Sequence, residues 1–142
     1  MSGPQDATVV DSLIAAARDA MAQAYAPYSR FSVGAAILGD SGRIHAGANV
    51  ENAAYPQGQC AEASAIGAMI LAGDRGIRAI VVMGGQTGDG RLCTPCGGCR
   101  QRLREFARPD TPIHVCGPEG LRQTFRLEEL LPHSFGPDNL DF

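Results

Sequence analysis

Residues 78–84 read Arg-Ala-Ile-Val-Val-Met-Gly, an almost unbroken apolar run. A run of this kind is typical of a central strand that is buried on both faces. Because both faces of such a strand must be covered, the run predicts a sheet that lies between helices. It is far shorter than the about 18 apolar residues that a membrane-spanning helix needs.

The segments on either side predict the other elements of a mixed sheet. Apolar side chains recur at helical spacing in residues 8–24. The turn Gly39-Asp40-Ser41-Gly42 separates two strand-like segments, 31–38 and 43–49, which form a predicted hairpin. Further along the chain we expect helices at 60–71, 96–106 and 128–131 and strands at 113–116 and 121–127. The fold class is therefore α/β, with helices layered on a mixed sheet.

The composition bounds the kind of protein. A chain of 142 residues with 44% hydrophobic and 19% charged residues is expected to form one domain, 1–142, around one core. The start of the sequence lacks the pattern of a secretory leader, which predicts a cytoplasmic protein without a membrane segment. The net charge of −3 and the acidic interruptions of its arginine cluster argue against nucleic-acid binding.

Five cysteines are an odd number in a chain without an export signal, so metal binding or catalysis is the first question. Cys96 and Cys99 are three residues apart and follow Pro95, which suits a helix start. Thiolates at a helix start are stabilised by the unpaired N–H groups there. On its own, this motif fits half a zinc site, a redox dithiol or two small core residues equally well.

Cys60-Ala61-Glu62 adds a third thiolate and a carboxylate at the start of another predicted helix. Positions two apart on a regular helix point about 200° away from each other, so both side chains reach one site only if Cys60 precedes the regular helix. Three protein ligands leave the fourth position of zinc open, as in a catalytic site. We expect Cys93 and Cys116 to be core residues.

Cys60-Ala61-Glu62 followed by Pro95-Cys96-Gly97-Gly98-Cys99 resembles the zinc-dependent cytidine deaminases, specifically the small homotetrameric three-cysteine type. The resemblance extends over about residues 10–140. It includes residues 26–29 (Ala-Pro-Tyr-Ser), 31–36 (Phe-Ser-Val-Gly-Ala-Ala), 49–52 (Asn-Val-Glu-Asn) and 131–137 (Leu-Pro-His-Ser-Phe-Gly-Pro). It implies a three-layer α/β/α fold with a mixed five-stranded sheet between helices.

The resemblance also implies an activity and its residues. Cys60, Cys96 and Cys99 would hold one Zn²⁺ per chain, and Glu62 would carry protons in the hydrolytic deamination of cytidine and 2′-deoxycytidine, a step of pyrimidine salvage. The active sites of the homotetramer would be shared between subunits, with Phe135 entering a neighbouring site. The implied substrate-binding residues are Phe31, Asn49, Glu51, Tyr55, Ala61 and Phe135.

One position departs from the family pattern. Proteins of this type commonly carry an arginine directly after the catalytic glutamate, where it pairs with the ligand thiolates, but this chain has Ala63. Arg100, next to Cys99, is the nearby cation that the sequence offers in its place.

Three alternatives remain open. The first is a deaminase of another aminopyrimidine nucleoside, such as a blasticidin-type antibiotic. The second is a thioredoxin-like redox protein that uses Cys96 and Cys99, although this leaves Cys60 and Glu62 without a role. The third is a binding module stabilised by a closed four-thiolate zinc site, which would require Cys93 or Cys116.

Overall fold

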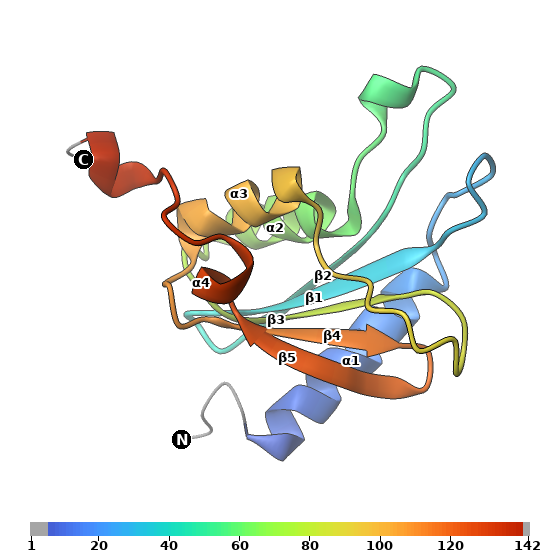
Figure 1. Cartoon of the computed structure of the whole chain (residues 1–142), viewed down its shortest axis with the longest axis horizontal. Coiled ribbons are helices and arrows are strands. Elements are labelled where there is room, and N and C mark those ends of the chain that lie inside the picture. Colours follow the sequence, from blue (N-terminus) through green and yellow to red (C-terminus); the bar gives the residue numbers. More distant parts are fainter. Residues whose placement is uncertain (1–5, 141–142) are drawn as a thin grey trace.

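The computed structural model describes residues 6–140 and consists of a five-stranded sheet with helices on both faces (Figure 1). Residues 1–5, part of the start of the sequence that lacks a leader pattern, lie outside the described residues. The helices are α1 (Ala7–Met21), α2 (Ala61–Leu71), α3 (Gly97–Phe106) and α4 (Leu127–Leu130), with 3-10 turns η1 (Tyr55–Gln57) and η2 (Pro137–Leu140). The strands are β1 (Val33–Gly39), β2 (Ile44–Ala48), β3 (Ile77–Gly84), β4 (Pro112–Gly117) and β5 (Gly120–Arg126).

The sheet is mixed, with strand order β2-β1-β3-β4-β5. β1 pairs antiparallel with β2 and β3, β3 pairs parallel with β4, and β4 pairs antiparallel with β5. The predicted central strand is β3, and all of its residues except Arg78 are buried. The expected three-layer α/β/α fold with a mixed five-stranded sheet is confirmed.

Alternate side chains of β3 enter two separate cores. Ile80 and Val82 pack with α2 and α3 on one face, whereas Val81 and Met83 pack with α1 on the other. This alternation follows from the two-residue period of a strand. The helical layers are visible on opposite sides of the sheet in Figure 1.

Two glycines let the helices approach the sheet closely. A Cβ at Gly34 in β1 would lie 2.1 Å from the carbonyl oxygen of Ala17 in α1, and a Cβ at Gly47 in β2 would lie 2.3 Å from the backbone nitrogen of Ala65 in α2. No real Cβ makes such a contact with backbone, so the absence of a side chain at these positions sets the distance between the layers.

No helix within residues 6–140 combines the length and the apolar character that crossing a bilayer would require.

Candidate active site

Two helices begin at cysteines on the same side of the sheet. Cys60 is the N-cap of α2 (φ −74°, ψ 155°), and Cys96 is the N-cap of α3 (φ −68°, ψ 170°). Both therefore have extended backbone just before the regular helix. For Cys60, this is the position from which its side chain and that of Glu62 were expected to reach one site. Cys99 lies in the first turn of α3 and is fully buried.

The sulfur atoms of Cys60, Cys96 and Cys99 all lie within 4.8 Å of one another. Zn–S bonds of about 2.3 Å place the sulfurs of a tetrahedral site about 3.8 Å apart, so these thiols fit one zinc ion after a small closure. Between residues 6 and 140, this is the one group of three or more ligand-type side chains that meets the same distance limit. Because the fourth position has no protein ligand in that group and Cys96 is exposed, the site is open on one side.

Thiol acidity differs across the cluster. Burial raises the pKa of Cys99 far above its ordinary value, and burial also raises the pKa of Cys60. Hydrogen bonding from the backbone N–H of Cys99 lowers the pKa of Cys96. In the absence of metal, Cys96 is thus the most acidic of the three, and binding a cation is what would ionise the others.

The remaining two cysteines are placed as the sequence predicted. Cys93 is half-buried and packs against the core beneath α2 and α3, with its sulfur facing Gly84 of β3. Cys116 lies in β4, is fully buried and belongs to the core under α1. Neither belongs to the cysteine cluster.

Glu62 lies in the first turn of α2 and is only 5% exposed. Burial raises its pKa above the ordinary range, and a hydrogen bond with the Cys99 side chain acts in the opposite direction. A carboxyl group in such a position exchanges protons closer to neutral pH than an exposed one. It is therefore placed to move protons beside the cysteine cluster.

Arg100 does not supply the cation that is missing at Ala63. Its guanidinium donates from Nε to the carbonyl oxygen of Pro95 (2.7 Å) and from Nη1 to that of Leu130 (2.8 Å), so it is held by backbone carbonyls. Arg102 contacts the cluster instead, with Nη1 3.7 Å from the sulfur of Cys99. The spacing of three residues between Cys99 and Arg102 is the sequence signal for this contact, because side chains three apart are neighbours on a helix.

Asn49 supports the start of β1. Its Oδ1 accepts from the backbone N–H of Val33 (2.9 Å), and its Nδ2 donates to the carbonyl oxygen of Phe31 (2.9 Å). These two bonds leave one N–H and one lone pair of the amide for another partner. The Phe31 side chain is 47% exposed.

Glu51 is tied to the turn before Phe31. Its Oε1 accepts from the backbone N–H groups of Tyr28 (2.9 Å) and Ser29 (3.1 Å), and its Oε2 accepts from the Ser29 hydroxyl. The hydroxyl bond is the main reason that the pKa of Glu51 is lowered. The carboxylate lines an open cavity of about 300 Å³ that also includes Tyr55.

The remaining predicted substrate residues lie at different places. Ala61 is buried in the first turn of α2, between Cys60 and Glu62. Tyr55 in η1 is 74% exposed, with its ring centroid 5.9 Å from that of Tyr28. Phe135 is 57% exposed, and η1 and the C-terminal segment project from opposite ends of the α2–α3 layer (Figure 1). One chain therefore does not bring the segments of Tyr55 and Phe135 together.

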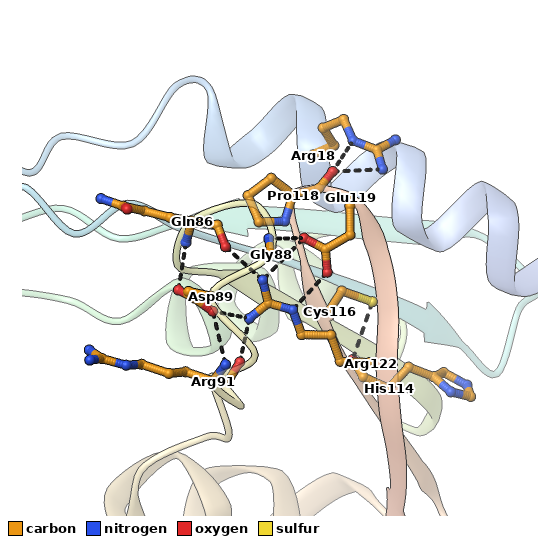
Figure 2. A network of polar contacts seen from close by, with 10 residues as sticks. All are labelled: Arg18, Gln86, Gly88, Asp89, Arg91, His114, Cys116, Pro118, Glu119 and Arg122. Atoms are coloured by element: carbon orange, nitrogen blue, oxygen red, sulfur yellow. Dashed lines mark hydrogen bonds and ion pairs between the residues drawn. The ribbon is translucent and has the colours of Figure 1, made fainter.

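The loop that connects β3 to α3 is fixed by Arg122, a role that was not predicted from the sequence. Arg122 of β5 donates to the Asp89 carboxylate (2.5 Å), to the Glu119 carboxylate (2.7 Å) and to the carbonyl oxygens of Gln86 (2.7 Å) and Arg91 (Figure 2). The Arg122 side chain is 9% exposed. One buried guanidinium thus holds the loop that leads to the cysteines of α3.

Comparison with known proteins agrees with this geometry. Residues 8–115 match the family described as the cytidine and deoxycytidylate deaminase zinc-binding region. A cytidine deaminase of Sporosarcina psychrophila is 37% identical over 133 residues, which cover 94% of this chain and 96% of that protein. One of Mycobacterium tuberculosis is 42% identical over 125 residues, 87% of each chain.

The fold is similar to that of solved deaminases. The crystal structure of cytidine deaminase from Burkholderia pseudomallei superposes with a TM-score of 0.80 at 38% identity and covers 88% of this chain and 98% of that one. These matches remove the thioredoxin-like alternative, which shares neither the family nor the third cysteine. The chain belongs to the cytidine and deoxycytidylate deaminase family, whose zinc-binding region spans the helix starts described above.

Proposed function

We propose that this protein removes the amino group of free cytidine and 2′-deoxycytidine by hydrolysis, giving uridine or 2′-deoxyuridine and ammonia. One observation carries the proposal: three thiols from two helix starts converge within 4.8 Å, with the buried carboxyl group of Glu62 against one of them. The proposed setting is pyrimidine salvage in the cytoplasm.

The donor set fits one zinc ion per chain, held by Cys60, Cys96 and Cys99. Three thiolates are soft ligands that suit zinc, and an open fourth position is typical of catalytic rather than structural sites. The closed four-thiolate alternative needs Cys93 or Cys116, and both pack into the cores instead. When bound, zinc acts as a Lewis acid that makes water nucleophilic at neutral pH.

Glu62 moves the protons. Its carboxylate takes one proton from the attacking water as the C4–O bond forms, and delivers it to N3 of the pyrimidine. It then passes the second water proton to the amino group, the C4–N4 bond breaks and ammonia leaves. The burial of Glu62 supports this role, because a carboxyl group with a raised pKa both accepts and returns protons readily.

The nucleoside would lie between the cysteine cluster and the segments that carry Phe31, Asn49 and Glu51. The free N–H of Asn49 and the remaining acceptor capacity of Glu51 suit ribose hydroxyl groups. The exposed ring of Phe31 suits stacking on the base. Ala61, between Cys60 and Glu62, would contact the pyrimidine through its backbone.

We also propose a homotetramer in which subunits complete one another's active sites. Tyr55 and Phe135 are exposed aromatic residues, and the segments that carry them, η1 and the C-terminal segment, project from opposite ends of the α2–α3 layer. Exposed aromatic residues of this kind are enriched at protein interfaces. Gln101 of α3 donates to the backbone carbonyl oxygen of Phe135 and Arg104 donates to the hydroxyl of Ser134, so neither bond uses the Phe135 ring, which is free to reach a neighbouring subunit.

The test is the loss of cytosine absorbance and the release of ammonia when purified zinc-loaded protein is added to cytidine. Glu62→Gln should retain zinc and lose turnover by about 10²- to 10⁴-fold, because it removes the proton carrier and keeps the size of the side chain. Cys99→Ala should lose zinc, whereas the matched controls Cys93→Ala and Cys116→Ala should keep it.

Two results would contradict the proposal. Unchanged cytidine with folded protein that carries one zinc per chain would exclude this substrate, and faster turnover of a blasticidin-type nucleoside would identify the alternative. Substantial activity in Glu62→Gln would mean that another group moves the protons.

A further inference from the structure

Helix α3 carries three arginines at alternate positions, Arg100, Arg102 and Arg104. With about 100° per residue, the middle one points away from the other two. Arg100 binds the carbonyl oxygens of Pro95 and Leu130. Arg104 binds the Ser134 hydroxyl (2.8 Å) and the Asp138 carboxylate (2.7 Å). Two of the three guanidinium groups thus bind residues of the segments before and after α3 rather than the cysteine cluster.

Arg102 faces the cysteine cluster. Its Nη1 lies 3.7 Å from the sulfur of Cys99, within hydrogen-bond distance for sulfur. A Cβ at Gly98 would lie 3.4 Å from the same nitrogen, an ordinary contact, which places the guanidinium close against the first turn of α3. In the part of the chain that the structure describes, no carboxylate forms an ion pair with Arg102. Arg102 therefore stays available to the cysteine cluster, and its charge also lowers the pKa of Glu62 beside that cluster.

The cluster needs such a charge. Three thiolates around one divalent zinc leave one net negative charge, which the partial positive charges at the starts of α2 and α3 offset only in part. Ala63 and Arg100 do not supply a cation to it. A guanidinium that donates to a thiolate sulfur stabilises the charged form by a charge-assisted hydrogen bond.

We propose that Arg102 is a positioning residue of the zinc site, whose guanidinium holds the sulfur of Cys99 and offsets the thiolate charge so that the site retains its metal. The proposal rests on the zinc site of the proposed function, and it adds a residue outside the Cys-Ala-Glu and Pro-Cys-Gly-Gly-Cys motifs. Arg102 is exposed, so its effect is expected to be moderate and sensitive to salt.

The experiment compares Arg102→Gln with Arg104→Gln, which removes the same charge from the same helix without touching a cysteine. Zinc affinity is measured by competition with a chromophoric chelator, after circular dichroism has shown both variants to be folded. Arg102→Gln should bind zinc about three- to tenfold more weakly than wild type, whereas Arg104→Gln should stay within about twofold. Arg102→Lys should recover most of the loss, and 1 M KCl should reduce the difference.

A second readout does not depend on affinity or activity. In cobalt(II)-substituted protein, the thiolate-to-metal charge-transfer band reports the energy of the sulfur lone pairs. Loss of a donor to Cys99 should move this band to longer wavelength in Arg102→Gln and leave it in place in Arg104→Gln.

Equal zinc affinities and equal spectra for the two variants would overturn the role of Arg102 while leaving the ligand set intact. Equal losses in both would also overturn it, because the effect would then belong to net charge alone. If wild type binds no zinc, the ligand set and the role of Arg102 fail together. An inactive wild type with the expected affinity pattern would retain Arg102 and refute only the substrate.

Discussion

Helix α2 packs closely on β2 directly beneath the turn that carries Glu62, and a substitution at this contact tests whether the packing positions the proposed catalytic residue. In Gly47→Ala the new Cβ would lie 2.3 Å from the backbone nitrogen of Ala65 and 2.8 Å from the carbonyl oxygen of Ala61. Ordinary contact begins near 3.4 Å, so the first turns of α2 must move by about 1 Å. Overpacking against backbone of this size costs about 1–3 kcal/mol.

For a chain of 142 residues, each kcal/mol corresponds to roughly 4 °C, so Tm should fall by about 4–12 °C. The same displacement moves Cys60 and Glu62, and a misplacement of this order should lower kcat/KM by about 10- to 100-fold. Thermal unfolding by circular dichroism and initial rates with cytidine measure the two effects.

The matched control is Gly67→Ala on the same helix, where a Cβ meets nothing within 4 Å. An exposed alanine in place of glycine should stabilise α2 by about 0.5–1 kcal/mol. If Gly47→Ala melts within 1–2 °C of wild type, or Gly67→Ala is the more damaging change, the close packing of α2 on β2 is wrong.

Two further predictions concern charge and capping. Glu119 has its pKa lowered from 4.5 to about 2, chiefly by its bond with Arg122. Arg122→Gln should therefore have a lower free energy of unfolding than wild type at pH 7, and this difference should shrink as pH falls from about 4.5 towards 2. Urea unfolding at pH 7, 4 and 3 measures it, and a difference that stays constant with pH would contradict the prediction. For Cys96 we expect both Ser and Ala variants to lose zinc, but metal-free Cys96→Ser should be the more stable by about 1 kcal/mol, since serine caps a helix and alanine does not. Equal melting of the two metal-free variants would mean that position 96 has no capping role.

Much of the fold could be predicted from local patterns. The apolar run at 78–84 corresponds to β3 (Ile77–Gly84), and the helices expected from residues 60 and 96 begin at Ala61 and Gly97. These predictions succeed because burial on both faces, helical spacing and residues that favour helix starts act within a few neighbouring positions. The convergence of the three thiols was predictable for the same reason, since each lies at a helix start.

Interactions between distant segments could not be predicted in this way. Arg122 reaches Gln86 across 36 positions, and no local pattern indicates which arginine of the chain will hold that loop. Asn49 was predicted to bind substrate, but its amide also positions Phe31, a role that depends on the register of the hairpin. Arg100 is adjacent to Cys99 in sequence but binds a backbone carbonyl, whereas Arg102 contacts the Cys99 sulfur, because side chains three apart are neighbours on a helix.

In the proposed ligand set the cysteines would link metal binding to the local fold, which gives a physical reason for a site at helix starts. α1 is capped by the side chain of Asp6, whose Oδ1 accepts from the N–H of Thr8. The corresponding positions of α2 and α3 are Cys60 and Cys96, so the ends that carry partial positive charge face sulfur instead of a carboxylate. A thiol is a weak acceptor and a thiolate a stronger one, so these helix starts are best stabilised when the sulfurs are ionised. Zinc held by the proposed ligand set would ionise them, and the free energy of binding zinc would then also order the turn that places Glu62.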